Sequence, residues 1–231
     1  RPRAVVCVPS CVTEVENRAV KDACERAGVK RVEIIEEPVA AAIGAGIDIS
    51  QPSGRMVIDI GGGTADIAVI SFSGVVVSTS VKMGGDKFDE AIVRYVRKKH
   101  KVLIGERTAE QIKKQIGCVT ARPKELLVKV KGRCMVTGLP KQITLSSEEV
   151  REAVQECAAA IGDAARRVLE ETPPELASDI FLNGVVMTGG GSLIYGIDRY
   201  LADVLSVPVS VAERAEECVG VGTGESLQFI S

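Results

Sequence analysis

The feature that most constrains the fold is a run of three glycines that occurs twice, each time directly after a strand-like segment. The first run lies in IDIGGGTADIAVI, residues 58–70, where apolar β-type residues flank the glycines on both sides. Strand-like residues on both sides predict a β-hairpin rather than a strand that turns into a helix. The second run lies in VVMTGGGSLIYGI, residues 185–197, and a helix-like segment follows it.

The first run has the chemistry of an anion-binding loop. Without Cβ atoms, Gly61, Gly62 and Gly63 leave room for phosphate oxygens to reach the backbone N–H groups. Asp59 would stand beside that phosphate, which is unfavourable unless a cation intervenes, so it is a candidate Mg²⁺ ligand through water. A plain turn capped by Asp59 is the alternative. The run lacks the GxxxxGK[ST] pattern of a P-loop, and Asp66 stands where GxGxxG requires its last glycine.

The second run, Gly189, Gly190 and Gly191, precedes a predicted helix, whose N-terminus adds partial positive charge to the loop N–H groups. This loop could lie along a phosphate or under a nucleoside, and both roles need glycine for close approach. Close packing of the strand against the helix is the alternative explanation. On its own, neither glycine run identifies the ligand.

The rest of the chain alternates between strand-like and helix-like segments, which indicates an α/β fold. Strands are predicted at 3–10, 31–37, 56–60, 65–73, 75–83, 123–145 with turns at Gly132 and Gly138, 184–188 and 207–212. Helices are predicted at 14–27, 39–46, 86–99, 109–117, 147–171, 193–205 and after 216. The short helix at 39–46 is rich in small residues and is expected to pack closely.

Four helix starts are predicted from their first residues. Thr13 with Glu16, and Ser146 with Glu149, have the spacing of capping boxes. Asp86 and Thr108 are predicted as N-caps of their helices. The buried side of the first helix is expected to carry Val15, Val20, Ala23, Cys24 and Ala27.

Composition excludes several functions. The formal net charge of −2 over 231 residues gives no reason to expect nucleic acid as a partner, and the basic run at 94–101 is best explained as a solvated helix face. Seven cysteines without a CxxC pair fit a reduced compartment, with zinc at Cys7 and Cys11 a minor alternative. The single histidine, His100, leaves almost no candidate for a catalytic triad. No segment approaches the roughly 20 apolar residues of a membrane span.

Five motifs occur together and in order: IEEPVAAAIGAG at 35–46, DIGGGTADIAVI at 59–70, MGGDKFDEAI at 83–92, GERTAEQIKKQIG at 105–117 and VVMTGGGSLIYGI at 185–197. In this combination the chain resembles the MreB family of bacterial actin homologues, whose superfamily includes actin, sugar kinases and the seventy-kilodalton heat-shock chaperones. The resemblance covers essentially the whole chain. It implies an actin-like ATPase fold of the ribonuclease H-like type, with ATP and Mg²⁺ as cofactors.

The resemblance also assigns site residues. The first glycine run with Thr64 resembles a phosphate loop, and the second with Ser192 resembles the adenosine loop. Glu110 and Lys113 match helix positions that contact the nucleoside, although a solvated Glu110–Lys114 pair is the alternative. Asp86 follows Gly84 and Gly85 at the start of its helix, among the residues expected to contact the cofactor.

The resemblance implies catalytic roles for Glu37 and Thr64. Glu37 matches the residue that orients or activates the attacking water, and Thr64 matches its partner beside the terminal phosphate. Phosphoryl transfer to water depends mainly on positioning and charge neutralisation, which a carboxylate and a hydroxyl can supply. A helix-leading acid before Pro38 is the alternative for Glu37.

Two actin-like subdomains are expected to close on the nucleotide. Residues 1–47 and 216–231 would be part of the first, residues 48–97 and 146–215 the second, and residues 98–145 a small inserted cap. In the family, a further strand hairpin with a DLGT-type phosphate loop comes before the segment that matches residues 1–47. No such stretch stands before Arg1 in this sequence. An N-terminally truncated chain is therefore expected, and whether these 231 residues hydrolyse ATP stays open.

The implied function is that of a cytoplasmic cytoskeletal protein whose membrane-associated filaments determine rod shape by organising cell-wall synthesis. Expected partners are further copies in antiparallel pairs of protofilaments, membrane-bound cell-wall elongation proteins, and the inner membrane surface, reached through elements outside this chain. A sugar or small-molecule kinase would need a second substrate pocket, and a chaperone-like ATPase an appended domain. The last alternative is an interaction remnant that no longer hydrolyses or binds nucleotide.

Overall fold

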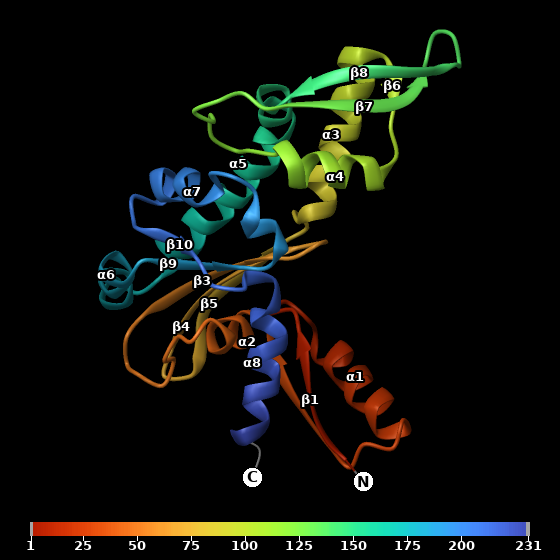
Figure 1. Ribbon diagram of the computed structural model, residues 1–231. Coiled ribbons are helices and arrows are strands. Elements are labelled where there is room, and N and C mark those ends of the chain that lie inside the picture. The colour runs from red at the N-terminus through yellow and green to blue at the C-terminus, as the bar shows by residue number, and fades with distance from the viewer. Residues whose placement is uncertain (1, 230–231) are drawn as a thin grey trace.

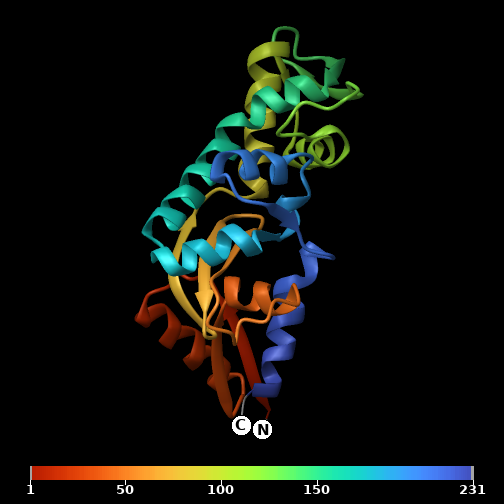
Figure 2. The same cartoon turned by 90° about the vertical axis from the view of Figure 1, so that its left-hand side faces the viewer.

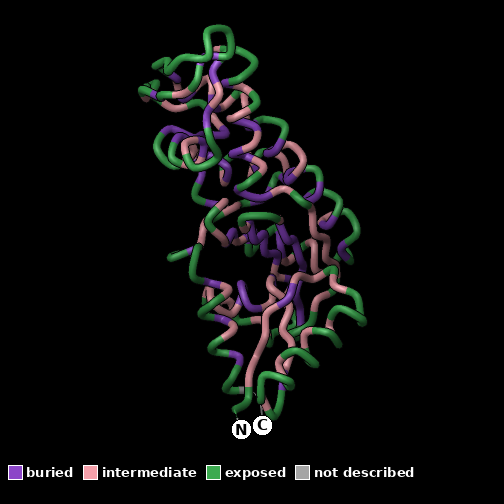
Figure 3. The backbone as a smooth tube through the Cα atoms, turned by 90° about the vertical axis from the view of Figure 1, so that its right-hand side faces the viewer, coloured by how far each residue is buried: buried purple, intermediate pink, exposed green. Residues whose placement is uncertain are grey.

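Three β-sheets follow one another along an elongated molecule in the computed structural model, which describes residues 2–229 (Figure 1). A two-stranded sheet lies at the end that holds both termini. A five-stranded sheet forms the middle, and a three-stranded sheet lies at the opposite end (Figure 2). Figure 3 shows that buried residues concentrate in the middle and upper parts, whereas the end with the termini is largely half-buried or exposed.

The terminal sheet pairs β1 (Arg3–Val8) with β2 (Arg31–Glu36) in parallel, and α1 (Glu14–Arg26) connects them. The predicted Thr13–Glu16 capping box is confirmed. The predicted buried side of α1 is wrong, because the helix has no buried residue and Val15 is 78% exposed. Only a two-stranded sheet lies beside α1, so Val20 and Cys24 are half-buried and the remaining apolar positions face outward.

Helix α2 (Glu37–Gly44) packs backbone against backbone with α8 (Cys218–Ser226), as the small residues of α2 predict. A Cβ atom on Gly44 would lie 1.9 Å from the carbonyl oxygen of Cys218. A Cβ atom on Gly222 would lie 1.8 Å from the carbonyl oxygen of Ala40. Glycine at both positions therefore brings the last helix of the chain beside the segment that follows β2 (Figure 2).

The central sheet has the strand order β10-β9-β3-β4-β5. The predicted meander is confirmed, since β3 (Arg55–Ile60), β4 (Ala65–Ser71) and β5 (Gly74–Val81) are antiparallel neighbours. Strands β9 (Val185–Thr188) and β10 (Val209–Val211) extend the sheet in parallel. The first glycine run thus closes a hairpin, and the second follows a strand that pairs with β3.

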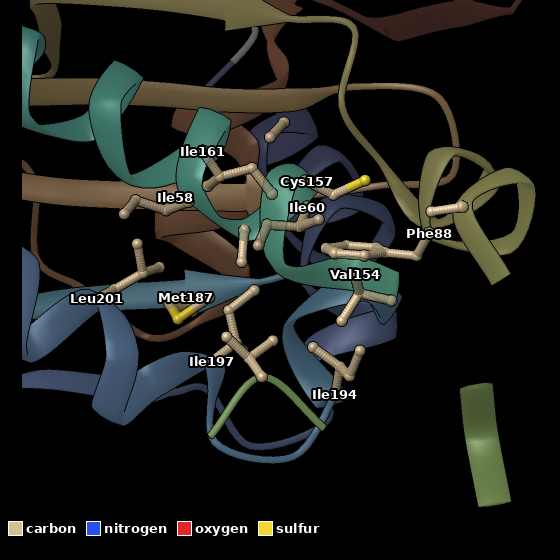
Figure 4. Packing of buried hydrophobic residues seen from close by; sticks show 14 of the residues in the cluster. Ile58, Ile60, Phe88, Val154, Cys157, Ile161, Met187, Ile194, Ile197 and Leu201 are labelled. Atoms are coloured by element: carbon tan, nitrogen blue, oxygen red, sulfur yellow. The ribbon is translucent and has the colours of Figure 1, made fainter. Parts of the chain in front are cut away.

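The two faces of the central sheet have different neighbours. On one face, Ile58, Ile60 and Met187 pack with Ile161 of α5 (Ser147–Glu171) and Leu201 of α7 (Ile197–Leu205) in the main core (Figure 4). On the other face, a smaller cluster joins the sheet to α2. Its members are Ala41, Ala42, Val57, Ala68 and Ile70. Because strand side chains alternate, Asp59 and Asp66 lie on this second face with Val57 and Ala68.

The segment 98–145, called the cap below, adds the three-stranded sheet. It holds β6 (Val102–Leu103), α4 (Glu106–Ile116), β7 (Leu127–Cys134) and the start of β8 (Pro140–Ser146), and α3 (Gly85–His100) leads into it. The sequence did not predict β6. Gly138 is at a turn with φ +75°, but Gly132 is not, because it lies inside β7 where a Cβ atom would be 2.4 Å from the Leu103 oxygen.

The remaining helix starts and ends predicted from the sequence agree only in part with those in the structure. The capping box at Ser146 and Glu149 is confirmed at the start of α5, and α6 (Pro174–Asn183) follows the Thr172 break. Asp86 and Thr108 are not N-caps, because Gly84 and Gly105 hold those positions and the two polar residues lie in the first helical turns. After the second glycine run, the 3₁₀ turn η1 (Gly190–Leu193) precedes α7. Two further 3₁₀ turns, η2 (Ala215–Glu217) and η3 (Leu227–Phe229), flank α8.

Candidate functional site

A cavity of about 790 Å³ lies where the central sheet, α3, α4 and η1 meet. This volume is in the range of small-molecule and cofactor sites. Seven predicted site residues line it: Gly61, Gly62, Asp86, Glu110, Lys113, Gly190 and Gly191. Residues distant in the sequence are thus brought together by the fold. The other predicted residues do not line the cavity: Gly63, Thr64, Gly189 and Ser192 belong to the two glycine loops, Asp59 lies near the end of β3, and Glu37 begins α2.

The first glycine loop turns its carbonyl groups toward α3. The Gly61 N–H donates to the Thr64 oxygen at 2.9 Å, and the Gly61 and Gly62 oxygens accept from Gly85 N (2.9 Å) and Asp86 N (2.8 Å). Within residues 2–229, the N–H groups of Gly62 and Gly63 have no protein acceptor. Two N–H donors therefore stay available for a ligand.

Folding alone does not explain three glycines in this loop. None of them has a positive φ, and a Cβ atom on Gly63 would meet no atom within 4 Å. On Gly61 and Gly62 a Cβ atom would make only ordinary contacts at 3.7 Å. Because neither backbone strain nor packing requires glycine here, open space together with unpaired N–H donors favours a bound anion over a plain turn.

Packing explains most of the second glycine loop. Gly189 has φ +79°, and its Cβ atom would lie 2.3 Å from the Ile60 oxygen. A Cβ atom on Gly191 would lie 2.3 Å from Cγ2 of Ile60. The Ser192 hydroxyl donates to the Gly189 oxygen at 2.6 Å and so closes the turn. Only Gly190 has open space, with its nearest neighbour 4.0 Å away on Glu216, and it lines the cavity.

Helix α4 contributes charged side chains to the opposite wall. Glu110 pairs with Lys114 at 2.8 Å, and this hydrogen bond lowers the pKa of Glu110. Lys113 Nζ donates to the Gly85 oxygen and to Oδ2 of Asp89, both at 2.9 Å. Burial raises the pKa of Asp89, and the Lys113 hydrogen bond opposes that effect. Asp89 lines the cavity but was not predicted, because its link to α4 depends on the fold.

Two buried aspartates face each other across the hairpin. Asp59 and Asp66 are direct partners in the β3–β4 register and are 6% and 1% exposed. Thr188 Oγ1 donates to Asp59 Oδ1 at 2.6 Å, and Thr64 Oγ1 donates to Asp66 Oδ2 at 2.8 Å. Each carboxylate thus has its own threonine. Sequence reasoning missed Asp66, although a second aspartate two residues after Thr64 was the available signal.

Glu37 lies near the same pair of aspartates. Burial raises the pKa of Glu37, and the negative charges of Asp66 and then Asp59 raise it further. Burial also raises the pKa of Asp59, against the effect of the Thr188 hydrogen bond. Glu37 begins α2, so the fold brings together two of the predicted residues, Glu37 and Asp59, with Asp66 as a third carboxylate.

This carboxylate cluster is compatible with Mg²⁺. Like charges directly opposite in a sheet are destabilising, so a cation nearby would be favourable. No group of three or more His, Cys, Asp or Glu in the described part of the chain could hold a metal ion by itself. Mg²⁺ commonly keeps several waters and binds through one or two carboxylates plus substrate phosphates, a mode that Asp59 beside the first glycine loop fits.

Fold and site together define an actin-like α/β protein with a cavity between its central sheet and its cap. The chain belongs to the MreB/Mbl protein family, whose sequence profile matches residues 1–231. This confirms the family and the fold class that the five motifs predict. None of the described helices is long and apolar enough to cross a membrane.

Curated relatives are similar over nearly the whole chain. The cell shape-determining protein Mbl of Bacillus cereus is 53% identical over 230 residues, covering 100% of this chain and 69% of its own length. The cell shape-determining protein MreB of Escherichia coli is 49% identical over 229 residues, covering 99% of this chain and 66% of its own length. The chain thus spans about two thirds of the length of these relatives.

Solved structures of related proteins match the fold of this chain over nearly its whole length. The crystal structure of MreB5 of Spiroplasma citri bound to ADP has a TM-score of 0.96 at 42% identity, covering 99% of this chain and 69% of that chain. The same protein bound to AMPPNP has a TM-score of 0.95. The MamK double helical filament has a TM-score of 0.81 at 21% identity, with 98% of this chain and 68% of that chain covered, which shows the shared fold.

Proposed function

We propose that this chain binds ATP with Mg²⁺ in the cavity and acts as part of a filament-forming cytoskeletal protein. That protein would determine rod cell shape by organising cell-wall synthesis. Relatives at 49–53% identity are named cell shape-determining proteins, and the MreB5 structures hold ADP and AMPPNP. The observation that carries the proposal is the first glycine loop, whose open space and unpaired N–H groups suit a phosphate.

Each wall of the cavity has a part in this proposal. The N–H groups of Gly62 and Gly63 bind phosphate oxygens, and Gly190 allows the nucleoside to approach the turn after β9. Glu110 and Lys113 on α4 contact the nucleoside, which requires Glu110 to share or leave its pair with Lys114. Asp86 at the start of α3 lies beside the phosphates, while Gly189, Gly191 and Ser192 hold the second loop in shape. Mg²⁺, held through water by Asp59, would neutralise phosphate charge.

Glu37 and Thr64 are assigned to hydrolysis. A carboxylate with a raised pKa accepts a proton from water more readily than an ordinary one, and Glu37 has that property. Thr64 closes the other side of the first loop, so its hydroxyl can position the same water. The resulting activity is a slow ATPase that yields ADP and phosphate.

The proposed assembly is the one that the family resemblance implies. Subunits that stack head to tail through different surfaces form open filaments, and two such protofilaments pair antiparallel. Residues 1–47 with 216–231 form part of one actin-like subdomain, residues 48–97 with 146–215 form the second, and the cap is inserted in the second. Further partners are membrane-bound cell-wall elongation proteins and the inner membrane surface, which leaves the filaments cytoplasmic and membrane-associated.

Filament assays on the full-length protein test this function. Sedimentation and phosphate release are measured with Mg²⁺ and ATP for the parent, Glu37→Ala and Thr64→Ala. The parent should form filaments with ATP and release phosphate, and both variants should form filaments that turn over more slowly. Parent-like turnover in both variants would show that the catalytic roles are wrong. Absence of ATP-dependent filaments in the parent would contradict the function itself.

A further inference from the structure

Asp66 is a buried carboxylate that the proposed function does not use. It is 1% exposed on β4, and Oδ2 accepts the hydroxyl hydrogen of Thr64 at 2.8 Å. Its second oxygen, Oδ1, is buried and has no hydrogen-bond partner within residues 2–229. Burying a carboxylate is costly unless it is hydrogen-bonded, so the contact with Thr64, its one side-chain hydrogen bond within residues 2–229, matters to this site.

The contact with Asp66 determines what the Thr64 hydroxyl can do. A threonine hydroxyl has one hydrogen to donate and two lone pairs that accept. Because Asp66 takes the hydrogen, the Thr64 oxygen can only accept hydrogen bonds from other groups. A phosphate oxygen has no hydrogen to give when ionised, whereas a water molecule does. The Thr64 oxygen is therefore suited to a water and not to an ionised phosphate.

The hairpin does not need this contact for its closure. The Gly61 N–H already donates to the backbone oxygen of Thr64 at 2.9 Å, and β3 and β4 pair from Arg55 with Ile70 to Ile60 with Ala65. Asp59, opposite Asp66, is held by Thr188 and not by Thr64. Among the described residues, Asp66 is the partner that fixes the Thr64 hydroxyl.

We propose that Asp66 is a positioning residue, which takes the hydroxyl hydrogen of Thr64 and so makes the Thr64 oxygen an acceptor for the attacking water. This rests on the proposed ATP hydrolysis. In that reaction the water oxygen forms a bond to the terminal phosphorus, and the bond from that phosphorus to the bridging oxygen breaks. The bridging oxygen keeps the electron pair and leaves with ADP, and the water gives a proton to Glu37. Asp66 itself touches neither the water nor the phosphate.

The test compares variants of the full-length protein in phosphate release and in ATP affinity measured by calorimetry. Asp66→Ala should lower kcat by about 10-fold or more, because a misplaced group costs rate without loss of binding. The Kd for ATP should stay within about 2-fold of the parent value, since Asp66 does not contact the nucleotide. Asp66→Asn keeps an oxygen that accepts from Thr64 and should retain about a third or more of the parent kcat.

A double variant separates positioning from a general structural role. Thr64→Ala combined with Asp66→Ala should be no slower than Thr64→Ala alone, because Asp66 acts through that hydroxyl. Losses that multiply in the double variant would overturn the proposal, as would parent-like kcat in Asp66→Ala. An Asp66→Asn variant as slow as Asp66→Ala would also overturn it. Should Asp66→Ala fail to fold, Asp66→Leu replaces it with the same expectation.

Failure of the proposed function gives a different result. If the parent neither binds nor hydrolyses ATP, the function is wrong and Asp66 has no water to position. If the parent binds and hydrolyses ATP while Asp66→Ala keeps its kcat, the function stands and the role of Asp66 is wrong.

Discussion

A methyl group placed on Gly63 would meet no atom within 4 Å, whereas one on Gly191 would lie 2.3 Å from Cγ2 of Ile60. At the scale of single residues, the two glycine loops therefore have different requirements. Glycine at 191 serves the packing of the turn against β3. Glycine at 63 leaves space that no described part of the protein fills, and the proposed phosphate is what would occupy it.

The Gly63→Ala variant separates binding from folding. Its methyl group would occupy the space assigned to the phosphate, so the affinity for ATP should fall about 10-fold or more, equivalent to about 1.4 kcal/mol. The melting temperature without ligand should stay close to that of the parent, since the added Cβ meets no protein atom. Gly224→Ala, also in open space, is the matched control and should bind ATP normally. Equal affinity in both variants would contradict the role of the first loop.

Site residues differ in how far the sequence reveals them. The glycine runs with Asp59 and Thr64 are local patterns, so their neighbourhood is predictable from the chain itself. Asp66 contacts Thr64 two residues away, which is a local signal, but its place opposite Asp59 depends on strand register. Asp89 acquires its contact through the approach of α4 to α3, which no local pattern encodes. The assigned roles of the site residues stay predictions until a ligand is bound.

At the scale of elements, the packing of α2 against α8 brings their backbones into direct contact. Gly222 lies against the Ala40 oxygen, whereas a Cβ on Gly220, two residues earlier in α8, would meet no atom within 4 Å. The two glycines therefore differ in packing while they share helical conformation and sequence context.

This difference gives a matched pair of variants. Gly222→Ala should lower the free energy of unfolding by about 1–3 kcal/mol, because the new methyl group clashes with backbone and the helices must separate. Gly220→Ala should leave it unchanged or raise it by up to about 1 kcal/mol, since alanine favours helix. Denaturant unfolding of both variants measures the effect. A Gly222→Ala variant as stable as Gly220→Ala would show that the helices pack differently.

The environment of Glu149, in the first turn of α5, predicts that the stability of the fold depends on pH. Burial tends to raise the pKa of Glu149, but hydrogen bonds from the Ser146 N–H, His100 and Lys99 lower it below the ordinary value of 4.5. A carboxyl with a lowered folded-state pKa stabilises the fold above its unfolded-state pKa, and this stabilisation is lost as the pH falls through the folded value.

Glu149→Gln keeps an oxygen that can accept from the Ser146 N–H but removes the charge, so it should lower stability at pH 7 by about 0.3–1 kcal/mol, as expected for a negative charge near a helix N-terminus. The difference from the parent should shrink as the pH falls below 4.5. Unfolding between pH 7 and pH 3 measures it, with the exposed Glu125→Gln as a control that should differ little from the parent at any pH. A difference that stays constant with pH would contradict the role of the Glu149 charge.

Elements defined by neighbouring residues were the most predictable. Both capping boxes and the β3–β4–β5 meander were predicted, because their signals lie within a few residues. Asp86 and Thr108 were wrong as caps, since glycines a few residues earlier had already begun the helices. The exposed side of α1 could not be predicted, because apolar periodicity does not say whether a partner is present to cover it.

At the scale of the whole molecule, the cavity connects parts of the chain that are far apart in the sequence. Its walls come from the β3–β4 hairpin, the start of α3, the cap helix α4 and the turn after β9. A ligand that contacts all of them would hold the cap against the central sheet. Saturating ATP with Mg²⁺ should therefore raise the melting temperature, with a stabilisation of about 2.7 kcal/mol at 100 times the Kd. An unchanged melting temperature at that concentration would contradict binding to the folded state.

The most direct test of the central claim is a crystal structure of the full-length protein with AMPPNP and Mg²⁺. The account predicts phosphates against the N–H groups of Gly62 and Gly63, Mg²⁺ near Asp59, and the nucleoside between Gly190 and α4. A nucleotide bound elsewhere, or a cavity without nucleotide at saturating concentration, would contradict the account.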